Sequence, residues 1–90
     1  MEKRGTYKRE ITRPMLKYIR LSRNCTQTRF GQIAGIDQSV IARLESGELE
    51  LTPTYEERIR KGIRSLRISN YELESIRKLI EYKQIRGYKP

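Results

Sequence analysis

The chain is 90 residues long, enough for one small domain with a modest hydrophobic core. Hydrophobic residues make up 36% of it and charged residues 34%, a balance that favours a packed helical domain over a disordered chain. The formal net charge is +9, which favours nucleic acid or another polyanion as the partner.

Several protein classes are excluded by residues that the sequence lacks. There is no histidine and only one cysteine, Cys25. An internal disulfide needs a second cysteine, and a His/Cys metal site needs more ligands than one thiol. We therefore expect no cofactor. We expect no enzymatic activity, because no nucleophile has an identifiable base and no glycine-rich phosphate loop is present. No apolar run approaches the roughly 20 residues of a membrane span. The amino-terminal residues lack the apolar core of a secretory signal, so we expect a cytoplasmic protein without a membrane partner.

The charge is distributed unevenly along the chain. Residues 1–24 carry eight basic and two acidic side chains, whereas residues 25–57 carry two basic and six acidic ones. Residues 58–90 carry ten basic and three acidic side chains. The positive charge needed to contact a polyanion therefore lies mainly in the two flanks.

Residues 1–12 are polar and basic, and they are predicted to form a flexible arm. Lys3 and Arg4 of this arm are candidates for contact with phosphates, and a solvated tail is the alternative. A helix is predicted over residues 13–23, with Thr12 as its N-cap and a proline in its first turn.

Residues 26–47 have the pattern of two short helices joined by a tight turn. Thr26 is a candidate N-cap, and apolar residues then follow at helical spacing. Gly35 stands where the end of a helix favours a residue that tolerates positive φ. Asp37 can cap a second helix, which Gly47 ends. Two helices joined by a glycine-containing turn are the signature of a helix-turn-helix.

These residues resemble those of the lambda-repressor/Cro-like (Xre) helix-turn-helix family. A typical member opens its second helix with a Thr-Gln pair, turns at Ala-Gly and opens its third helix with Ser-Gln-Ser-type residues. It ends that helix with Ile-x-Arg, then Ile, Leu or Trp, then Glu-x-Gly. The matching segments here are Thr26-Gln27, Ala34-Gly35, Asp37-Gln38-Ser39 and Ile41-Ala42-Arg43-Leu44-Glu45-Ser46-Gly47. The likeness extends from Leu16 to about Ser69.

The resemblance implies an all-α fold of about five helices. A lambda-repressor-like DNA-binding domain would span residues 13–69, and a C-terminal helix would follow it. The third helix of the domain would lie in the major groove of double-stranded DNA. By resemblance, Gln38, Ser39 and Arg43 would read bases and Ala42 would touch a thymine methyl group. The alternative is an exposed polar face on which Arg43 pairs with a nearby glutamate.

The resemblance also implies structural partners and contacts with the DNA backbone. Arg20 and Glu45 match a family pair that ties the first helix to the end of the third, and Gln27 would bind a phosphate and brace Gln38. Gly31 stands where relatives keep a small residue that lets two helices approach closely. The candidate backbone contacts are Gln27, Arg29, Thr52, Thr54, Tyr55, Lys3 and Arg4. The loop that carries Glu48 and Glu50 departs from the family and would repel phosphates that it faced.

Two capping boxes predict the starts of the last two helices. Thr54 with Glu57 begins one helix, and Ser69 with Glu72 begins another that runs to about Arg86. The second helix defines a C-terminal segment, residues 70–90, whose first apolar residues can reach the core. Later apolar residues are surplus to a core of this size and are candidates for a twofold dimer interface: Leu79, Ile80, Tyr82 and Ile85. The alternative is a helix folded entirely onto its own domain.

Together these features predict a sequence-specific DNA-binding transcriptional regulator of phage, mobile-element or bacterial type. We expect a repressor that binds a palindromic operator as a homodimer. One alternative is an antitoxin-type autorepressor that holds a protein partner with its C-terminal helix. Another is a protein-interaction adaptor or inhibitor that kept the fold without DNA readout.

Overall fold

A computed structural model describes residues 10–85, and the predicted phosphate contacts Lys3 and Arg4 lie outside this range. Over these residues the chain forms five α-helices and no strand. The helices are α1 (Met15–Leu21), α2 (Gln27–Ala34), α3 (Gln38–Ser46), α4 (Pro53–Ser65) and α5 (Asn70–Ile85). The predicted all-α fold is confirmed.

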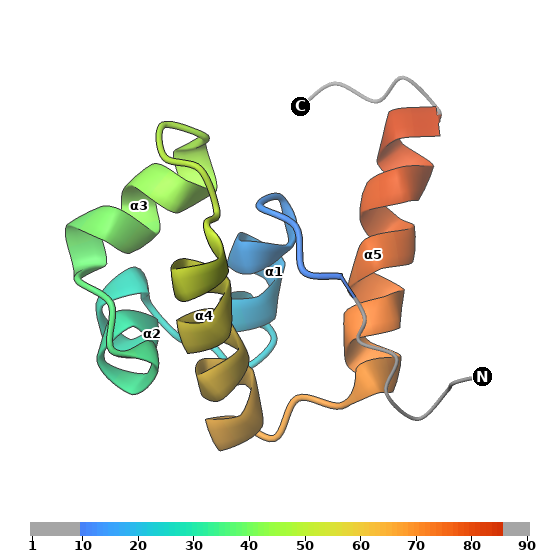
Figure 1. Ribbon diagram of the computed structural model, residues 1–90. Helices are drawn as coiled ribbons and strands as arrows, with labels where there is room; N and C mark the ends of the chain where they lie inside the picture. The colour runs from blue at the N-terminus through green and yellow to red at the C-terminus, as the bar shows by residue number, and fades with distance from the viewer. Residues whose placement is uncertain (1–9, 86–90) are drawn as a thin grey trace.

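The helices are arranged around α1. It packs against α5 on one side and against α3 on the other, while α2 packs against both α3 and α4. Figure 1 shows α5 on the far side of α1 from the α2–α3 pair. No helix within residues 10–85 is long and apolar enough to cross a membrane.

All five helices contribute to one hydrophobic core. The largest fully buried side chains come from the first four helices: Phe30, Met15, Leu16, Ile19, Ile41, Leu44 and Ile59. Leu73 and Ile76 of α5 are also buried, as the sequence predicts. The first half of α5 is therefore part of the domain, because its apolar face is removed from water against the other helices.

The amino-terminal boundary of the domain differs from the prediction. Ile11 is only 4% exposed and belongs to the core, and the side chain of Arg77 on α5 donates a hydrogen bond to the carbonyl of Glu10. The prediction of a flexible arm over residues 1–12 is therefore wrong for residues 10–12, which pack against the domain. An isolated isoleucine in a basic segment carries no periodicity that would reveal this contact.

The first helix begins later than predicted. Its N-cap is Pro14, and no side chain caps it. The Thr12 hydroxyl does not take the predicted capping role, because the backbone turns tightly there and the Met15 N–H donates to the Thr12 carbonyl at 3.0 Å. At the other end of α1, Asn24 adopts a φ of 56°, a conformation that asparagine tolerates better than most residues.

The fourth helix begins earlier than predicted. Its N-cap is Thr52, whose hydroxyl accepts the Tyr55 N–H at 3.3 Å, and Pro53 is its first residue. The predicted capping box that starts at Thr54 is therefore wrong. Proline is favoured at the first helical position, because its fixed φ suits a helix and its missing N–H would have no partner there.

The start of α5 is the predicted capping box. The Glu72 N–H donates to the Ser69 hydroxyl at 3.2 Å, and the Ser69 N–H donates to the Glu72 carboxylate at 2.9 Å. Each side chain thus satisfies a backbone donor that the first turn of a helix leaves without a partner.

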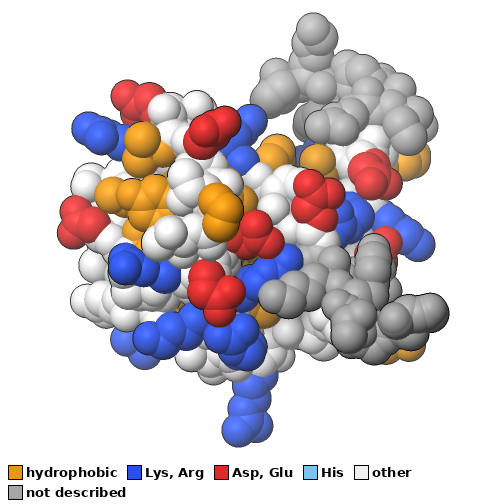
Figure 2. Space-filling model, viewed as in Figure 1, with side chains coloured by type: hydrophobic (Ala, Val, Ile, Leu, Met, Phe, Trp, Pro, Cys, Tyr) orange, Lys and Arg blue, Asp and Glu red, His pale blue; other side chains and the backbone are white. Residues whose placement is uncertain are grey.

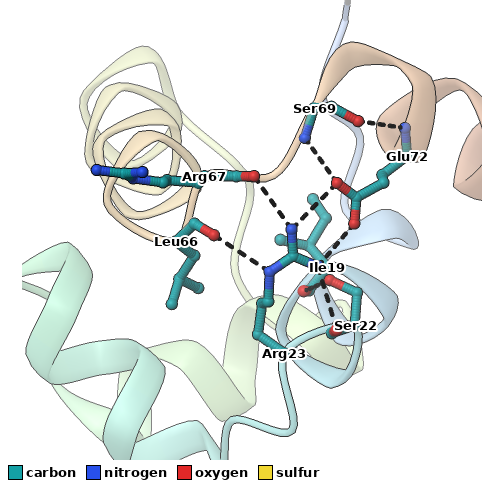
Figure 3. Close-up of polar contacts among 7 residues, drawn as sticks. All are labelled: Ile19, Ser22, Arg23, Leu66, Arg67, Ser69 and Glu72. Carbon is teal, nitrogen blue, oxygen red and sulfur yellow. Dashed lines mark hydrogen bonds and ion pairs between the residues drawn. The ribbon is translucent and has the colours of Figure 1, made fainter.

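Arg23 joins this box to the rest of the domain (Figure 3). Its guanidinium donates to the Leu66 carbonyl and the Arg67 carbonyl, each at 3.1 Å, and to both carboxylate oxygens of Glu72, at 2.6 and 3.1 Å. The hydrogen bond from Arg23, helped by that from the Ser69 N–H, lowers the pKa of Glu72 from 4.5 to about 2. One cation thus links the end of α1, the turn after α4 and the start of α5.

Candidate nucleic-acid interface

The α2–α3 pair has the predicted caps and turns. The Thr26 hydroxyl accepts the Arg29 N–H at 3.0 Å and so caps α2. Gly35 ends α2 with a φ of 74°, and Gly47 ends α3 with a φ of 89°. Both glycines occupy the left-handed region that other residues enter at a cost. The turn between the helices is therefore as short as a helix-turn-helix requires.

Gly31 allows the turn to pack directly against α2. A Cβ atom at this position would collide with the backbone carbonyl oxygen of Ile36. The same two residues are joined by a hydrogen bond of 2.9 Å from the Ile36 N–H to the Gly31 carbonyl. The prediction placed this close approach between the two helices, whereas the structure places it between α2 and the turn that precedes α3.

Asp37 is the N-cap residue of α3, as predicted, but its side chain makes no capping hydrogen bond. Its carboxylate instead accepts the Ser39 hydroxyl at 2.8 Å. The predicted side-chain cap is therefore wrong, because a nearby hydroxyl competes for the same carboxylate. Since the Ser39 hydrogen is engaged, its oxygen remains available mainly as an acceptor.

The face of α3 that points away from the core is polar. Ile41 and Leu44 are 1% and 0% exposed, whereas Gln38, Ser39 and Arg43 are exposed on the other side. Ala42, the fourth predicted base contact, is half-buried between them. The side chain of Arg43 makes no hydrogen bond or ion pair with any residue in the range 10–85. The alternative ion pair between Arg43 and a nearby glutamate is thus not formed among those residues.

Gln27 and Gln38 connect the starts of the two helices. The Gln38 Nε2 donates to the Gln27 Oε1 at 2.9 Å, so the predicted bracing contact is present. The Gln27 Nε2 in turn donates to the Glu45 carboxylate at 3.1 Å. Nothing in the sequence pattern pointed to this second bond, because it requires the first residue of α2 to meet the last turn of α3.

Arg20 and Glu45 form the pair implied by the family resemblance. The Arg20 Nε donates to one carboxylate oxygen at 2.7 Å and its Nη2 to the other at 3.0 Å. Their side chains are only 12% and 10% exposed. The hydrogen bond to Glu45 raises the pKa of Arg20, against the opposing effect of burial. A bidentate, poorly hydrated pair of this kind holds α1 and α3 in a fixed relation.

The predicted contacts with the DNA backbone fall into two groups. Gln27 and Arg29 lie in the first turn of α2, and Gln27 contacts the start of α3 through Gln38. Thr52, Thr54 and Tyr55 lie at the start of α4, after the loop that follows α3 (Figure 1), and so near the opposite end of α3 from Gln38. Tyr55 is half-buried against the core, and the Thr52 oxygen already accepts a backbone N–H. Of these residues, only Gln27 makes a described hydrogen bond with Gln38.

Two arginines that support the interface were missed by the sequence reasoning. The Arg58 guanidinium on α4 donates to the Gly35 carbonyl at 3.1 Å and steadies the turn. The Arg13 guanidinium lies against Gly47, at the C-terminal end of α3, where a cation complements the helix dipole. Both contacts join segments distant in sequence, so no local pattern predicts them.

The charge of the described surface is mixed (Figure 2). Lys and Arg side chains gather along the lower edge of the face shown, where α4 ends, and Asp and Glu side chains are scattered elsewhere. Glu48 and Glu50 are both exposed in the loop after α3. Some cations are engaged in ion pairs, as in the 2.8 Å contact between Arg60 and Glu56. Some of the cationic side chains are therefore already paired and less available to a polyanion.

The predicted dimer contacts on α5 differ in their exposure. Leu79 is 42% exposed and Tyr82 is 57% exposed, whereas Ile80 packs against the core of its own domain. The structure describes the backbone of Ile85 but not its side chain. Lys83 donates to the Tyr18 hydroxyl at 2.8 Å and so ties the second half of α5 to α1.

A comparison with protein families assigns the sequence of this region to a known family. A helix-turn-helix family model matches residues 16–61, from α1 into α4. No curated protein and no solved structure matches the chain. The matched segment contains the Arg20–Glu45 pair, both helices of the motif and the polar face of α3, and it ends before α5.

Proposed function

Because the chain belongs to the lambda-repressor/Xre-like helix-turn-helix family, whose members are DNA-binding regulators, we propose that it is a sequence-specific transcriptional repressor. It binds a palindromic operator in double-stranded DNA as a homodimer. The observation that carries this proposal is the exposed polar face of α3, which is braced by Gln27 and supported by the partly buried ion pair of Arg20 and Glu45.

The chemistry of that face suits the edges of base pairs. A glutamine can bond bidentately to adenine N6 and N7, an arginine to guanine O6 and N7, and a serine oxygen can accept from a base amino group. Gln38, Ser39 and Arg43 supply these three side chains from two adjacent turns of one helix. A helix of this size fits the major groove, so the three can reach neighbouring base pairs.

The start of α2 suits a phosphate beside those bases. Its backbone N–H groups and positive dipole end favour an anion, and Gln27 and Arg29 add side-chain donors there. Thr54 can add a hydroxyl at the start of α4. Bound in this way over a promoter, the protein would exclude RNA polymerase by occupying the site.

Dimerisation is supported by the exposed apolar residues of α5. Leu79 and Tyr82 lie on a helix that packs on the far side of α1 from α3, so pairing through them would leave the polar face of α3 uncovered. Two copies related by a twofold axis would present two α3 helices to the two halves of a palindrome.

Light scattering after size-exclusion chromatography tests the dimer. We expect a dimer at micromolar concentration that dissociates when Leu79 and Tyr82 are both replaced by serine. Lys78→Ser, an exposed change on the same helix, serves as the control and should leave the dimer intact. A monomer at high micromolar concentration would contradict dimerisation. Leu79 and Tyr82 would then be candidates for binding a different protein, as in an antitoxin-type regulator.

The proposed reading face is tested by the double variant Gln38→Ala with Arg43→Ala. Its preference for the operator over random duplex should fall by about 100-fold, since each bidentate base contact is worth about 1–3 kcal/mol. Nonspecific, salt-sensitive binding should persist, because contacts with phosphates remain. Arg64→Ala removes a cation from the exposed surface of α4 and should leave the preference unchanged. An unchanged preference in the double variant would contradict base reading by α3.

A further inference from the structure

Four side chains form a continuous set of hydrogen bonds from α1 to the exposed start of α3. Arg20 donates to both oxygens of Glu45, at 2.7 and 3.0 Å. The Gln27 Nε2 donates to Glu45 at 3.1 Å, and the Gln38 Nε2 donates to the Gln27 Oε1 at 2.9 Å. These four residues are referred to below as the relay. Its inner end is an ion pair and its outer end is a predicted base-reading side chain.

The chemistry of the inner end determines the direction of every hydrogen bond in the relay. A guanidinium can only donate hydrogen bonds and a carboxylate can only accept them, whereas a glutamine amide can do either according to which end it presents. Gln27 must therefore turn its NH₂ group toward Glu45 and its oxygen toward Gln38. That oxygen in turn requires an N–H from Gln38. The Arg20 and Glu45 side chains are 12% and 10% exposed, so water competes little for this anchor.

The outer end of the relay then presents a defined set of hydrogen-bonding groups. One N–H of Gln38 is used by Gln27, and its second N–H and its oxygen have no partner among residues 10–85. Gln38 consequently offers one donor and one acceptor side by side. In the major groove, adenine offers an acceptor at N7 and a donor at N6, whereas guanine offers two acceptors, N7 and O6. The pair of groups on Gln38 matches adenine.

We propose that Glu45 selects adenine over guanine at the base pair read by Gln38, by orienting the amide of Gln27. This inference rests on the proposed DNA-binding function and adds a specificity-determining residue that does not itself touch the DNA. Were the direction of the relay reversed, Gln38 would accept from Gln27 and turn both of its N–H groups toward the groove. Two donors match guanine, so the direction of the relay decides the preferred base.

The substitution Glu45→Gln tests the proposal with almost no change in shape. The new amide can donate to Gln27, so the reversed relay becomes available. The wild-type protein is first used to select an operator from a random duplex pool. The position read by Gln38 is then the one whose base preference is lost in Gln38→Ala. Dissociation constants are measured for two duplexes that differ only by adenine or guanine at that position.

We expect the wild type to favour the adenine duplex by about tenfold or more, and Glu45→Gln to reduce that preference by about tenfold. The reduction should include tighter binding of the guanine duplex, which damage to the fold would not produce. Glu48→Gln removes the same charge from an exposed loop residue and is the matched control. It should strengthen binding of both duplexes alike and leave their ratio unchanged.

A second variant covers the case in which Glu45→Gln fails to fold. Gln27→Met interrupts the relay without touching the ion pair, and it should also lower the preference for adenine. Gln32→Met makes the same change at an exposed position of α2 outside the relay and should preserve the preference. An adenine preference that survives Gln27→Met, or that survives Glu45→Gln where this variant folds, would overturn the relay while leaving DNA binding intact.

Two further outcomes would also overturn the proposal. A wild-type preference for guanine at the position read by Gln38 would contradict the direction of the relay alone. A wild-type selection that enriches no sequence would overturn the proposed function and the relay with it. The failure of the proposal and the failure of the proposed function are therefore distinguishable.

Discussion

Gly31 carries the strictest steric requirement among the glycines of the α2–α3 pair. Its missing side chain leaves room for the carbonyl oxygen of Ile36, a backbone atom that cannot move without displacing the turn. Gly35, four residues later, has a different requirement: no atom lies within 4 Å of a Cβ built there, but its φ is 74°. One glycine is thus needed for space and the other for backbone conformation.

Substitution of each glycine by alanine should separate these two causes. Gly31→Ala should lower the free energy of unfolding by about 3 kcal/mol, because overpacking against the backbone outweighs the gain in helix propensity. Gly35→Ala should cost about 1 kcal/mol, the cost of a left-handed conformation for a residue with a Cβ. Urea denaturation of the two variants measures both values. Equal stability of Gly31→Ala and the wild type would contradict the steric account.

For single residues, sequence reasoning succeeded where a residue and its immediate neighbours determine the cap or the backbone conformation. The cap at Thr26 and the positive φ of Gly35 and Gly47 follow from local backbone requirements. The side-chain cap at Asp37 failed because the Ser39 hydroxyl competes for the same carboxylate. Both residues suit a helix start, and the sequence does not show which contact is formed.

The start of α4 shows how two overlapping signals compete at the scale of an element. Thr52-Pro53 and Thr54 with Glu57 both resemble helix starts, and the structure uses the first. Proline at the first helical position and the Thr52 hydroxyl act together there. The boundary is therefore set two residues earlier than the capping-box pattern suggests.

Single substitutions distinguish the two possible caps of α4. Thr52→Ala should lower the free energy of unfolding by about 1 kcal/mol, the usual cost of removing an N-cap hydroxyl. Thr54→Ala should change it by less than about 0.5 kcal/mol, because Thr54 is an exposed residue in the first turn. Thermal or urea unfolding of the pair is the measurement. A larger loss of stability in Thr54→Ala than in Thr52→Ala would indicate that Thr54 is the cap.

The ion pair between Arg23 and Glu72 predicts a pH dependence for the docking of α5. The hydrogen bond from Arg23 lowers the pKa of Glu72 from 4.5 to about 2 in the folded protein. Because the folded-state pKa is the lower one, the contact contributes stability above about pH 4.5, and this contribution is lost as the pH falls toward 2. Unfolding of the wild type should therefore become easier over that range.

An NMR titration of the Glu72 carboxyl carbon measures this effect directly. We expect a midpoint near pH 2 in the wild type and a shift toward 4.5 in Arg23→Met. Lys61→Met removes an exposed cation from α4 and should leave the midpoint in place. A wild-type midpoint near 4.5 would show that the pair does not form in solution.

Sequence patterns located all the helices but missed several of the contacts that join them. The bonds of Arg23 to the Leu66 and Arg67 carbonyls and that of Arg58 to the Gly35 carbonyl link segments far apart in the chain. Such contacts depend on how the helices pack, which periodicity does not determine. The burial of Ile11 was missed for the same reason.

At the scale of the whole molecule, α3 and α5 pack on different sides of α1. The α2–α3 pair presents a polar face, α1 joins it to α5 through the core, and exposed apolar residues remain on α5. The fold and the position of α3 were predictable because the helix-turn-helix motif is local. The direction of the hydrogen bonds that reach Gln38 was not, since it depends on a contact between the ends of different helices.

The most direct test of the account is a selection from a random duplex pool near physiological salt, followed by sequencing. We predict enrichment of an inverted repeat whose half-sites are about one helical turn apart, roughly 34 Å. Salt-labile binding without enrichment of any sequence would contradict the account, because it would show that the positive charge binds DNA while the α3 face reads no bases.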